Sequence, residues 1–155
     1  MEIDAARSLN RLAVQATIHC LTGCAIGEVL GMVIGTALGW ETVPTIVLAV
    51  ILAFFFGYAL TIRPLLASGM RLARAARLAF AADTVSITVM EITDNAILLL
   101  IPAAMDAQLT DPLFWGSLAF SLAVAGVVAF PVNRWMIGRG QGHAVMHAAS
   151  GHMEH

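Results

Sequence analysis

Residues 13–39 read AVQATIHCLTGCAIGEVLGMVIGTALG, an apolar stretch long enough to cross a bilayer as one helix. Because residues four apart lie on the same side of an α-helix, a glycine at every fourth position forms a smooth ridge. Such ridges let two helix backbones approach closely in membranes. The stretch therefore predicts a membrane-spanning helix whose glycines pack inside a bundle or across a dimer. The five glycines of this ridge are Gly23, Gly27, Gly31, Gly35 and Gly39.

The whole chain has the composition of a membrane protein. Of its 155 residues, 59% are hydrophobic and 12% are charged, whereas soluble domains carry about 25% charged residues. This argues against a water-soluble enzyme, a disordered chain and a nucleic-acid-binding protein. We predict an all-α integral membrane protein, in which residues 1–142 form a bundle of four transmembrane helices. The expected spans are residues 13–39, 43–62, 78–102 and 112–132.

The positive charges are one-sided with respect to these spans. All eight are arginines, and each lies before the first span, between the second and third, or after the fourth. Cytoplasmic loops of membrane proteins carry an excess of basic residues, so we expect both termini in the cytoplasm and the bundle in a bacterial inner membrane. Pro64 is expected to end the second span, and Pro131 to kink or stop the fourth. The arginines are Arg7, Arg11, Arg63, Arg71, Arg74, Arg77, Arg134 and Arg139.

A polar face runs along the first span beside the glycine ridge. Cys20, Cys24 and Glu28 are spaced by four residues, so they share one side of the helix, with His19 one position further round. The face thus combines two thiols, a carboxyl group and a nearby imidazole.

The third span carries three carboxyl groups, Asp83, Glu91 and Asp94, on the same side as Met90. Ionisable groups in hydrocarbon are costly, and they usually face a bundle interior and mark a functional site. At 1.5 Å per residue, Glu28 and Glu91 both come out near mid-bilayer. We therefore expect the polar faces of the first and third spans to meet.

The C-terminal segment 143–155 is rich in histidine and is predicted to be a cytoplasmic tail. Met146 and Met153 are interleaved with its imidazoles, and this donor set suits copper, while imidazole alone also suits zinc. A solvated tail with chance histidines is the alternative. The histidines are His143, His147, His152 and His155.

The string HCLTGCAIGE at residues 19–28, followed by Gly31, resembles the start of a bacterial membrane family that is filed as a domain of unknown function. The resemblance covers residues 15–147 and implies a compact four-span domain, but no activity. Further strings that resemble the family are DT at 83–84, MEI at 90–92, DN at 94–95, DPLFWG at 111–116 and PVNRW at 131–135.

Our first functional hypothesis is the binding or transport of a transition metal, with Cu(I) as the expected ion and Zn(II) as the runner-up. Thiolate, thioether and imidazole ligands suit Cu(I), and thiolate, imidazole and carboxylate ligands suit Zn(II). Nearby carboxylates would accept the protons that metal binding releases. The predicted metal-site residues are His19, Cys20, Cys24, Met90, Glu28 and Glu91.

The second hypothesis is a proton-coupled carrier or cation channel without a transition metal. Its relay would consist of Asp83, Glu91, Asp94 and Glu28, and the cysteines would be small core residues. For a carrier of this size we expect a homo-oligomer in the lipid bilayer.

Two other readings remain, a redox enzyme and a purely structural protein. A disulfide between cysteines four apart in a helix is disfavoured by geometry. Haem is disfavoured because His19 is the only histidine within a span. Because the chain has no phosphate-binding glycine loop, nucleophile elbow or HExxH motif, we do not expect an enzyme, although the sequence leaves this open.

Overall fold

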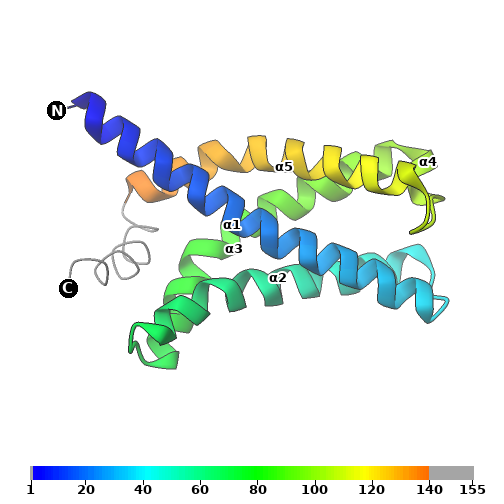
Figure 1. Cartoon of the computed structure of the whole chain (residues 1–155), viewed down its shortest axis with the longest axis horizontal. Coiled ribbons are helices and arrows are strands. Elements are labelled where there is room, and N and C mark those ends of the chain that lie inside the picture. The colour runs from blue at the N-terminus through cyan, green and yellow to red at the C-terminus, as the bar shows by residue number, and fades with distance from the viewer. Residues whose placement is uncertain (1, 140–155) are drawn as a thin grey trace.

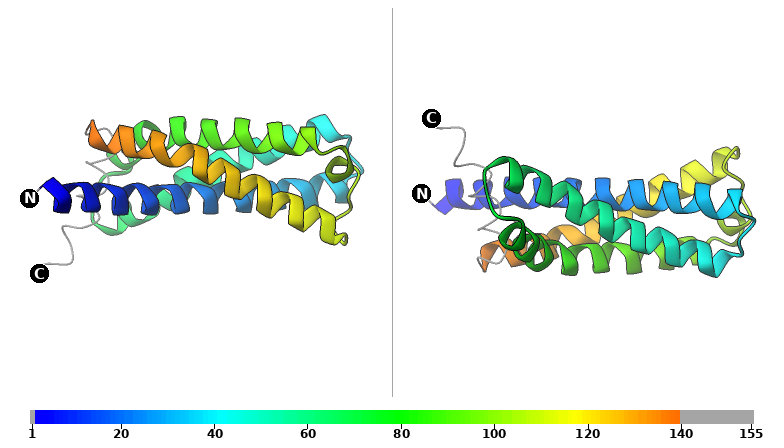
Figure 2. Two further views of the ribbon diagram at one scale, coloured as in Figure 1. Left: turned by 90° about the horizontal axis from the view of Figure 1, so that it is seen from above. Right: turned by 90° about the horizontal axis from the view of Figure 1, so that it is seen from below.

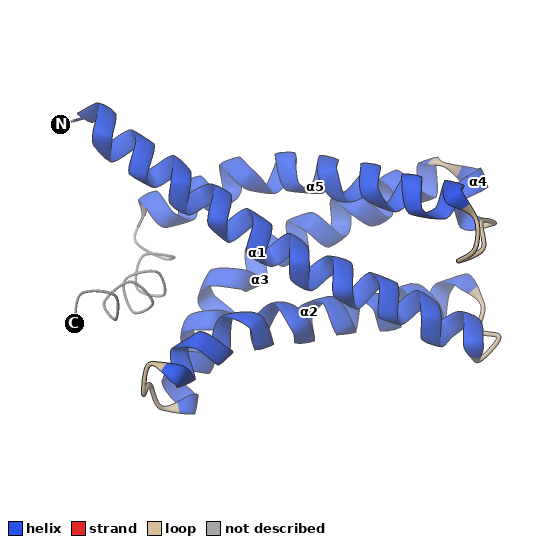
Figure 3. Cartoon of the chain, in the orientation of Figure 1, coloured by secondary structure: helices blue, strands red, loops and turns tan. Residues whose placement is uncertain are grey.

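The computed structural model describes residues 2–139 of the chain, and this part consists of helices joined by short loops (Figure 3). The predicted tail, with His143, His147, His152 and His155, lies outside the described residues. The helices are α1 (Glu2–Ala37), α2 (Thr42–Ala67), α3 (Leu72–Leu100), α4 (Pro102–Met105) and α5 (Pro112–Gly138).

The four long helices form an elongated bundle (Figures 1 and 2). α1 and α3 each pack against both α2 and α5, and they also meet each other across the centre. The start of α1, the end of α2, the start of α3 and the end of α5 lie at one end of the bundle (Figure 2). We call it the arginine end, because all eight arginines lie in or directly beside these four segments. The α1–α2 turn and α4 lie at the other end, which we call the pocket end.

The bundle is apolar outside and built of small residues inside. Its exposed side chains include many large hydrophobic ones, such as Phe55, Phe80 and Val127. The buried side chains, by contrast, include eight alanines. Small residues between helices and large apolar residues outside are typical of helices that pack in lipid.

Three helices, α1, α2 and α5, are each long and apolar enough to cross a membrane. α3 has 29 residues, or about 43 Å at 1.5 Å per residue, which exceeds a hydrocarbon core of about 30 Å. It contains, however, the arginines of its first turns and three of the four interior carboxyl groups, and it is not among the helices that qualify as spans by length and composition alone. The chain is therefore a helical membrane protein with at least three candidate spans.

The glycine ridge of α1 packs against α2. A Cβ atom added to Gly23, Gly27, Gly31 or Gly35 would lie less than 3.0 Å from atoms of α2. The facing residues on α2 also recur every fourth position and are small: Gly57, Ala53, Ala49 and Thr45. The ridge is thus used inside the bundle. Gly39 is different, because its φ of +64° ends the helix in a left-handed turn with open space around it.

The expected helix end at Pro64 is wrong, and Pro131, which was expected to kink or stop its helix, does not stop it. α2 continues through Pro64 to Ala67, and α5 continues through Pro131 to Gly138. A proline removes one backbone hydrogen bond, but both proline rings lie on exposed sides of their helices. The turns that follow are held by buried side chains, Leu65 after Pro64 and Met136 after Pro131. Packing of the last turns therefore outweighs the single lost hydrogen bond.

We expect Gly27→Ala to destabilise the bundle, because the new methyl group would meet the Ala53 backbone on α2. Overpacking of this kind costs about 1–3 kcal/mol. Gly116→Ala is the matched control, because a Cβ there has nothing within 4 Å and alanine favours a helix over glycine by about 1 kcal/mol. Thermal unfolding of both variants in detergent should show a lower midpoint only for Gly27→Ala; equal midpoints would contradict the close α1–α2 contact.

Candidate functional site

The polar face of α1 points to the centre of the bundle because the glycine ridge faces α2. Cys20, Cys24 and Glu28 each precede a ridge glycine by three residues, which places them about 60° round the helix from the ridge. All three are buried, with exposed fractions of 2%, 1% and 5%. Once the ridge is seated on α2, this face must turn towards α3 and α5.

Three carboxyl groups of α3 meet these α1 side chains, one after another along the bundle. Nearest the arginine end, the Cys20 Sγ donates to Asp83 Oδ1 at 3.9 Å. Next, the Cys24 thiol lies beside the Glu91 carboxyl group. Towards the pocket end, the Glu28 carboxyl group lies beside that of Asp94. We call this set the polar column; its residues are Cys20, Cys24, Glu28, Asp83, Ser86, Glu91 and Asp94.

The polar column is poorly satisfied by the protein. Buried oxygen atoms of Glu28, Asp83, Glu91 and Asp94 have no hydrogen-bond partner, and neither does the hydroxyl of Ser86. Neither oxygen of Asp94 has a partner, although its side chain is only 1% exposed. No arginine or lysine balances these acids, because all eight arginines are exposed and the chain has no lysine. Buried polar groups are normally paired, so these acceptors are available to something other than the fold.

Glu28 and Asp94 are a carboxyl pair that needs a proton or a cation. Two carboxylates can accept hydrogen bonds but cannot donate one, so their contact is favourable only if one of them is protonated or a cation lies nearby. Glu91 is tied more firmly, because Asn95 Nδ2 donates to its Oε2 at 3.5 Å and to its backbone oxygen at 2.9 Å.

α2 contributes a polar contact that the sequence did not reveal. The ring atom His19 Nε2 and Thr61 Oγ1 are hydrogen-bonded at 2.9 Å, and Thr61 also lies beside Asp83. His19 is therefore linked to the polar column through Thr61 rather than directly. A signal was present, since Thr61 is one of the few hydroxyl residues of α2, but the hydroxyl of a threonine in a span is often satisfied by its own helix backbone.

The arginine end of the bundle is closed by further hydrogen bonds. Asn133 Nδ2 on α5 donates to Thr17 Oγ1 on α1 at 2.9 Å, and both residues are buried. Tyr58 on α2 and Thr84 on α3 are joined through their hydroxyl groups at 2.8 Å. These contacts join α1 to α5 and α2 to α3.

The predicted metal ligands do not converge on one point. Among residues 2–139, no three His, Cys, Asp or Glu side chains are arranged so that they could hold a metal ion together. Cys20, Cys24 and Met90 share one buried core cluster with Ile87 and small residues of α2 and α5. His19 is directed to Thr61, and Glu28 contacts Asp94. Instead, Cys20, Cys24 and Glu28 of α1 each lie beside a different carboxyl group of α3, so that the polar column consists of separate pairs.

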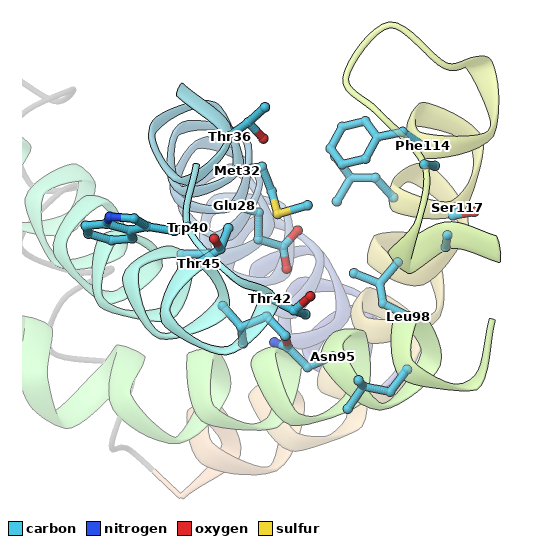
Figure 4. Close-up of a pocket in the computed structure, with 16 residues that line it drawn as sticks. Glu28, Met32, Thr36, Trp40, Thr42, Thr45, Asn95, Leu98, Phe114 and Ser117 are labelled. Carbon is cyan, nitrogen blue, oxygen red and sulfur yellow. The ribbon is translucent and has the colours of Figure 1, made fainter. Parts of the chain in front are cut away.

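A cavity of about 170 Å³ lies at the pocket end, between α1, α2, α3, α4 and α5. Figure 4 shows the Glu28 carboxyl group pointing into it, between Met32 on α1 and Asn95 on α3, with Phe114 and Ser117 of α5 on the far side. The walls are mainly apolar, with a few hydroxyl groups. Glu28 thus belongs both to the polar column and to this cavity, which the sequence did not predict because its residues come from five separate segments.

Fold and site together define a class: a small helical membrane protein with an unpaired acidic interior. The chain belongs to the family described as Domain of unknown function (DUF4396), which matches residues 9–142. The expected membership in an uncharacterised family is thereby confirmed. No curated protein and no solved structure matches the chain.

Proposed function

We propose that the polar column carries protons across the membrane, in a proton-coupled carrier or cation channel of the bacterial inner membrane. The observation that carries this proposal is the set of buried, unpartnered carboxyl oxygens of Glu28, Asp83, Glu91 and Asp94. Ionisable residues inside membrane bundles line proton relays and ion pathways. A purely structural protein would have no use for acids that make so few hydrogen bonds.

The order of the groups suits a relay. From the cavity, the column runs through Glu28 and Asp94, then Glu91, then Asp83, each on the interior of α1 or α3. From Asp83 the hydroxyl of Thr61 leads to the ring of His19, which is partly exposed near the arginine end. A proton taken up at the cavity would thus have acceptors along the bundle.

Proton movement into liposomes tests this proposal. Purified protein is reconstituted around a pH-sensitive dye, and flux is driven by a potassium diffusion potential and, separately, by a sodium gradient. We expect Glu28→Gln to lower the protein-dependent flux at least tenfold, because the amide cannot carry the proton. This variant should fold, since its amide N–H groups would be donors for the unpartnered Asp94 oxygens.

Two controls make the flux measurement specific. Glu41→Gln removes an exposed acid that caps no backbone group at the start of α2, and it should leave the flux unchanged. Replacing Cys20 and Cys24 together by alanine should also leave most of the flux, because the relay consists of carboxyl groups. Flux of Glu28→Gln equal to that of the unmodified protein, or no flux under either gradient, would overturn the proposal.

We further propose that α3 is a fourth span and that both termini are cytoplasmic. The eight arginines at one end of the bundle support this orientation through the bias of basic residues to cytoplasmic loops. The interior position of the α3 carboxyl groups supports burial of this helix within the bilayer. A homo-oligomer stays a prediction; its contacts would have to lie outside the glycine ridge, which α2 already covers.

Cysteine accessibility tests this topology. In a background without Cys20 and Cys24, single cysteines replace the exposed residues Ala67, before α3, and Asp106, after it. A membrane-impermeant maleimide should label Asp106→Cys in intact spheroplasts, and Ala67→Cys only after permeabilisation. Labelling of both from the same side would show that α3 does not cross.

A transition metal, Cu(I) in particular, is the second candidate substrate. The observation that favours it is that both thiols and the thioether of Met90 lie in one buried cluster, beside carboxyl groups that could accept protons. Sulfur ligands of this kind suit Cu(I). Zinc, which prefers four converging ligands, is less well served by the paired arrangement.

Titration with Cu(I) against a chromogenic chelator distinguishes a copper site in the polar column from one in the histidine tail. If the polar column binds copper, the full chain should take up one tight Cu(I) that a Cys20→Ser/Cys24→Ser variant loses and that a chain ending at Gly142 retains. Loss only in the shortened chain would assign copper to the histidine tail. No tight binding by the full chain would exclude the copper hypothesis.

A further inference from the structure

The cavity at the pocket end, which shares Glu28 with the polar column, has the features of a ligand site. Its volume of about 170 Å³ is comparable to that of a protein cavity of about 150 Å³ that holds benzene. Apolar walls with a few placed polar groups are typical of small-molecule sites. Here the walls include Met32, Ile46, Leu98 and Phe114.

One charged group is aimed into this apolar space. Glu28 is the only ionisable residue among the described residues that line the cavity. It is 95% buried, since its exposed fraction is 5%, and its Oε2 has no hydrogen-bond partner. An apolar pocket with a single unpaired carboxyl group complements a molecule that has one positive charge and an apolar body. A hydrated or bare metal ion would need several oxygen ligands around it, and no such group is present in the described part of the chain.

We propose that this cavity binds a small alkylammonium ion, with its ammonium group on Glu28 and its hydrocarbon part against Met32, Leu98 and Phe114. The proposal deepens the proposed function, on which it rests for its biological meaning, because it names the class of cation that would be coupled to protons. The carboxyl group of Glu28 would bind the ammonium group by a charge-assisted hydrogen bond.

Ammonium binding at Glu28 would displace a proton. The groups that face Glu28 are Asp94 and Glu91 on α3 and Cys24 on its own helix, while the parts of α2 and α5 that line the cavity contribute no ionisable group. With the Glu28–Asp94 pair holding one proton, arrival of an ammonium ion leaves both carboxyl groups as anions, and the proton leaves to water. The net charge of the site is then the same before and after the exchange.

The test is calorimetric titration of the full chain in detergent with isobutylammonium chloride. We expect one ion bound per chain, with about one proton released, measured as the dependence of the heat on the ionisation enthalpy of the buffer. The apparent affinity should rise about tenfold per pH unit while the pair holds its proton, by linkage. Isobutanol, a neutral molecule of nearly the same shape, should not bind.

Matched variants locate the site. Glu28→Gln should lower the affinity at least tenfold, whereas Glu41→Gln, which removes an exposed acid at the same end of the bundle, should not. Asp94→Asn should still bind the ammonium ion but release no proton, because the amide replaces the shared proton as donor. Ser117→Leu, which fills part of the cavity and leaves the carboxyl group in place, should weaken binding as well.

Several outcomes would overturn this inference: equal binding of isobutanol, unchanged affinity in Glu28→Gln, or no binding at any pH. These outcomes are distinguishable from failure of the proposed function. Ammonium binding without any proton flux in liposomes would support the ammonium site and contradict the proposed proton pathway. Proton flux that depends on Glu28, without ammonium binding, would support the proton pathway and contradict the ammonium site.

Discussion

The close contact between the glycine ridge of α1 and the small residues of α2 is the constraint on which the rest of the structure depends. Four glycines face Gly57, Ala53, Ala49 and Thr45, so that the two backbones touch where side chains would normally separate them. In lipid, such packing replaces the hydrophobic effect as the force between helices. Its consequence reaches further than α1 and α2, because it also fixes the rotation of α1 about its own axis.

That rotation decides where the acids go. With the ridge on α2, the side of α1 that carries Cys20, Cys24 and Glu28 faces the interior, where α3 presents Asp83, Glu91 and Asp94. Hydrocarbon makes any other direction for these side chains costly. The bundle thus contains acids without counter-ions, stacked between a hydrogen-bonded arginine end and a cavity at the pocket end. This asymmetry is what makes a directional, proton-linked role reasonable for so small a protein.

The cysteines illustrate how the same residues support two readings. Their spacing predicts a metal-binding face, but in the bundle each thiol meets one carboxyl group and a core of Ile87, Met90 and alanines. A buried free cysteine is also a satisfactory small core residue. The carboxyl groups cannot be explained as core residues in this way, because a buried oxygen without a hydrogen-bond partner destabilises the fold. The acids, and not the thiols, are therefore the strongest indication of function in this molecule.

The sequence by itself determined that the protein is a helical membrane protein and that the glycine ridge serves helix packing. It also determined which residues lie on the same face of each helix. These depend on composition and on the 3.6-residue period, which are local properties. Only the tertiary structure decided that Cys20, Cys24 and Glu28 each lie beside a different carboxyl group of α3. It also decided that His19 is hydrogen-bonded to Thr61 and that Glu28 lines a cavity. It also decided that α2 and α5 continue past their prolines. Each of these results depends on the relative rotation and depth of different helices, which are set by contacts between segments distant in the chain and therefore leave no local pattern.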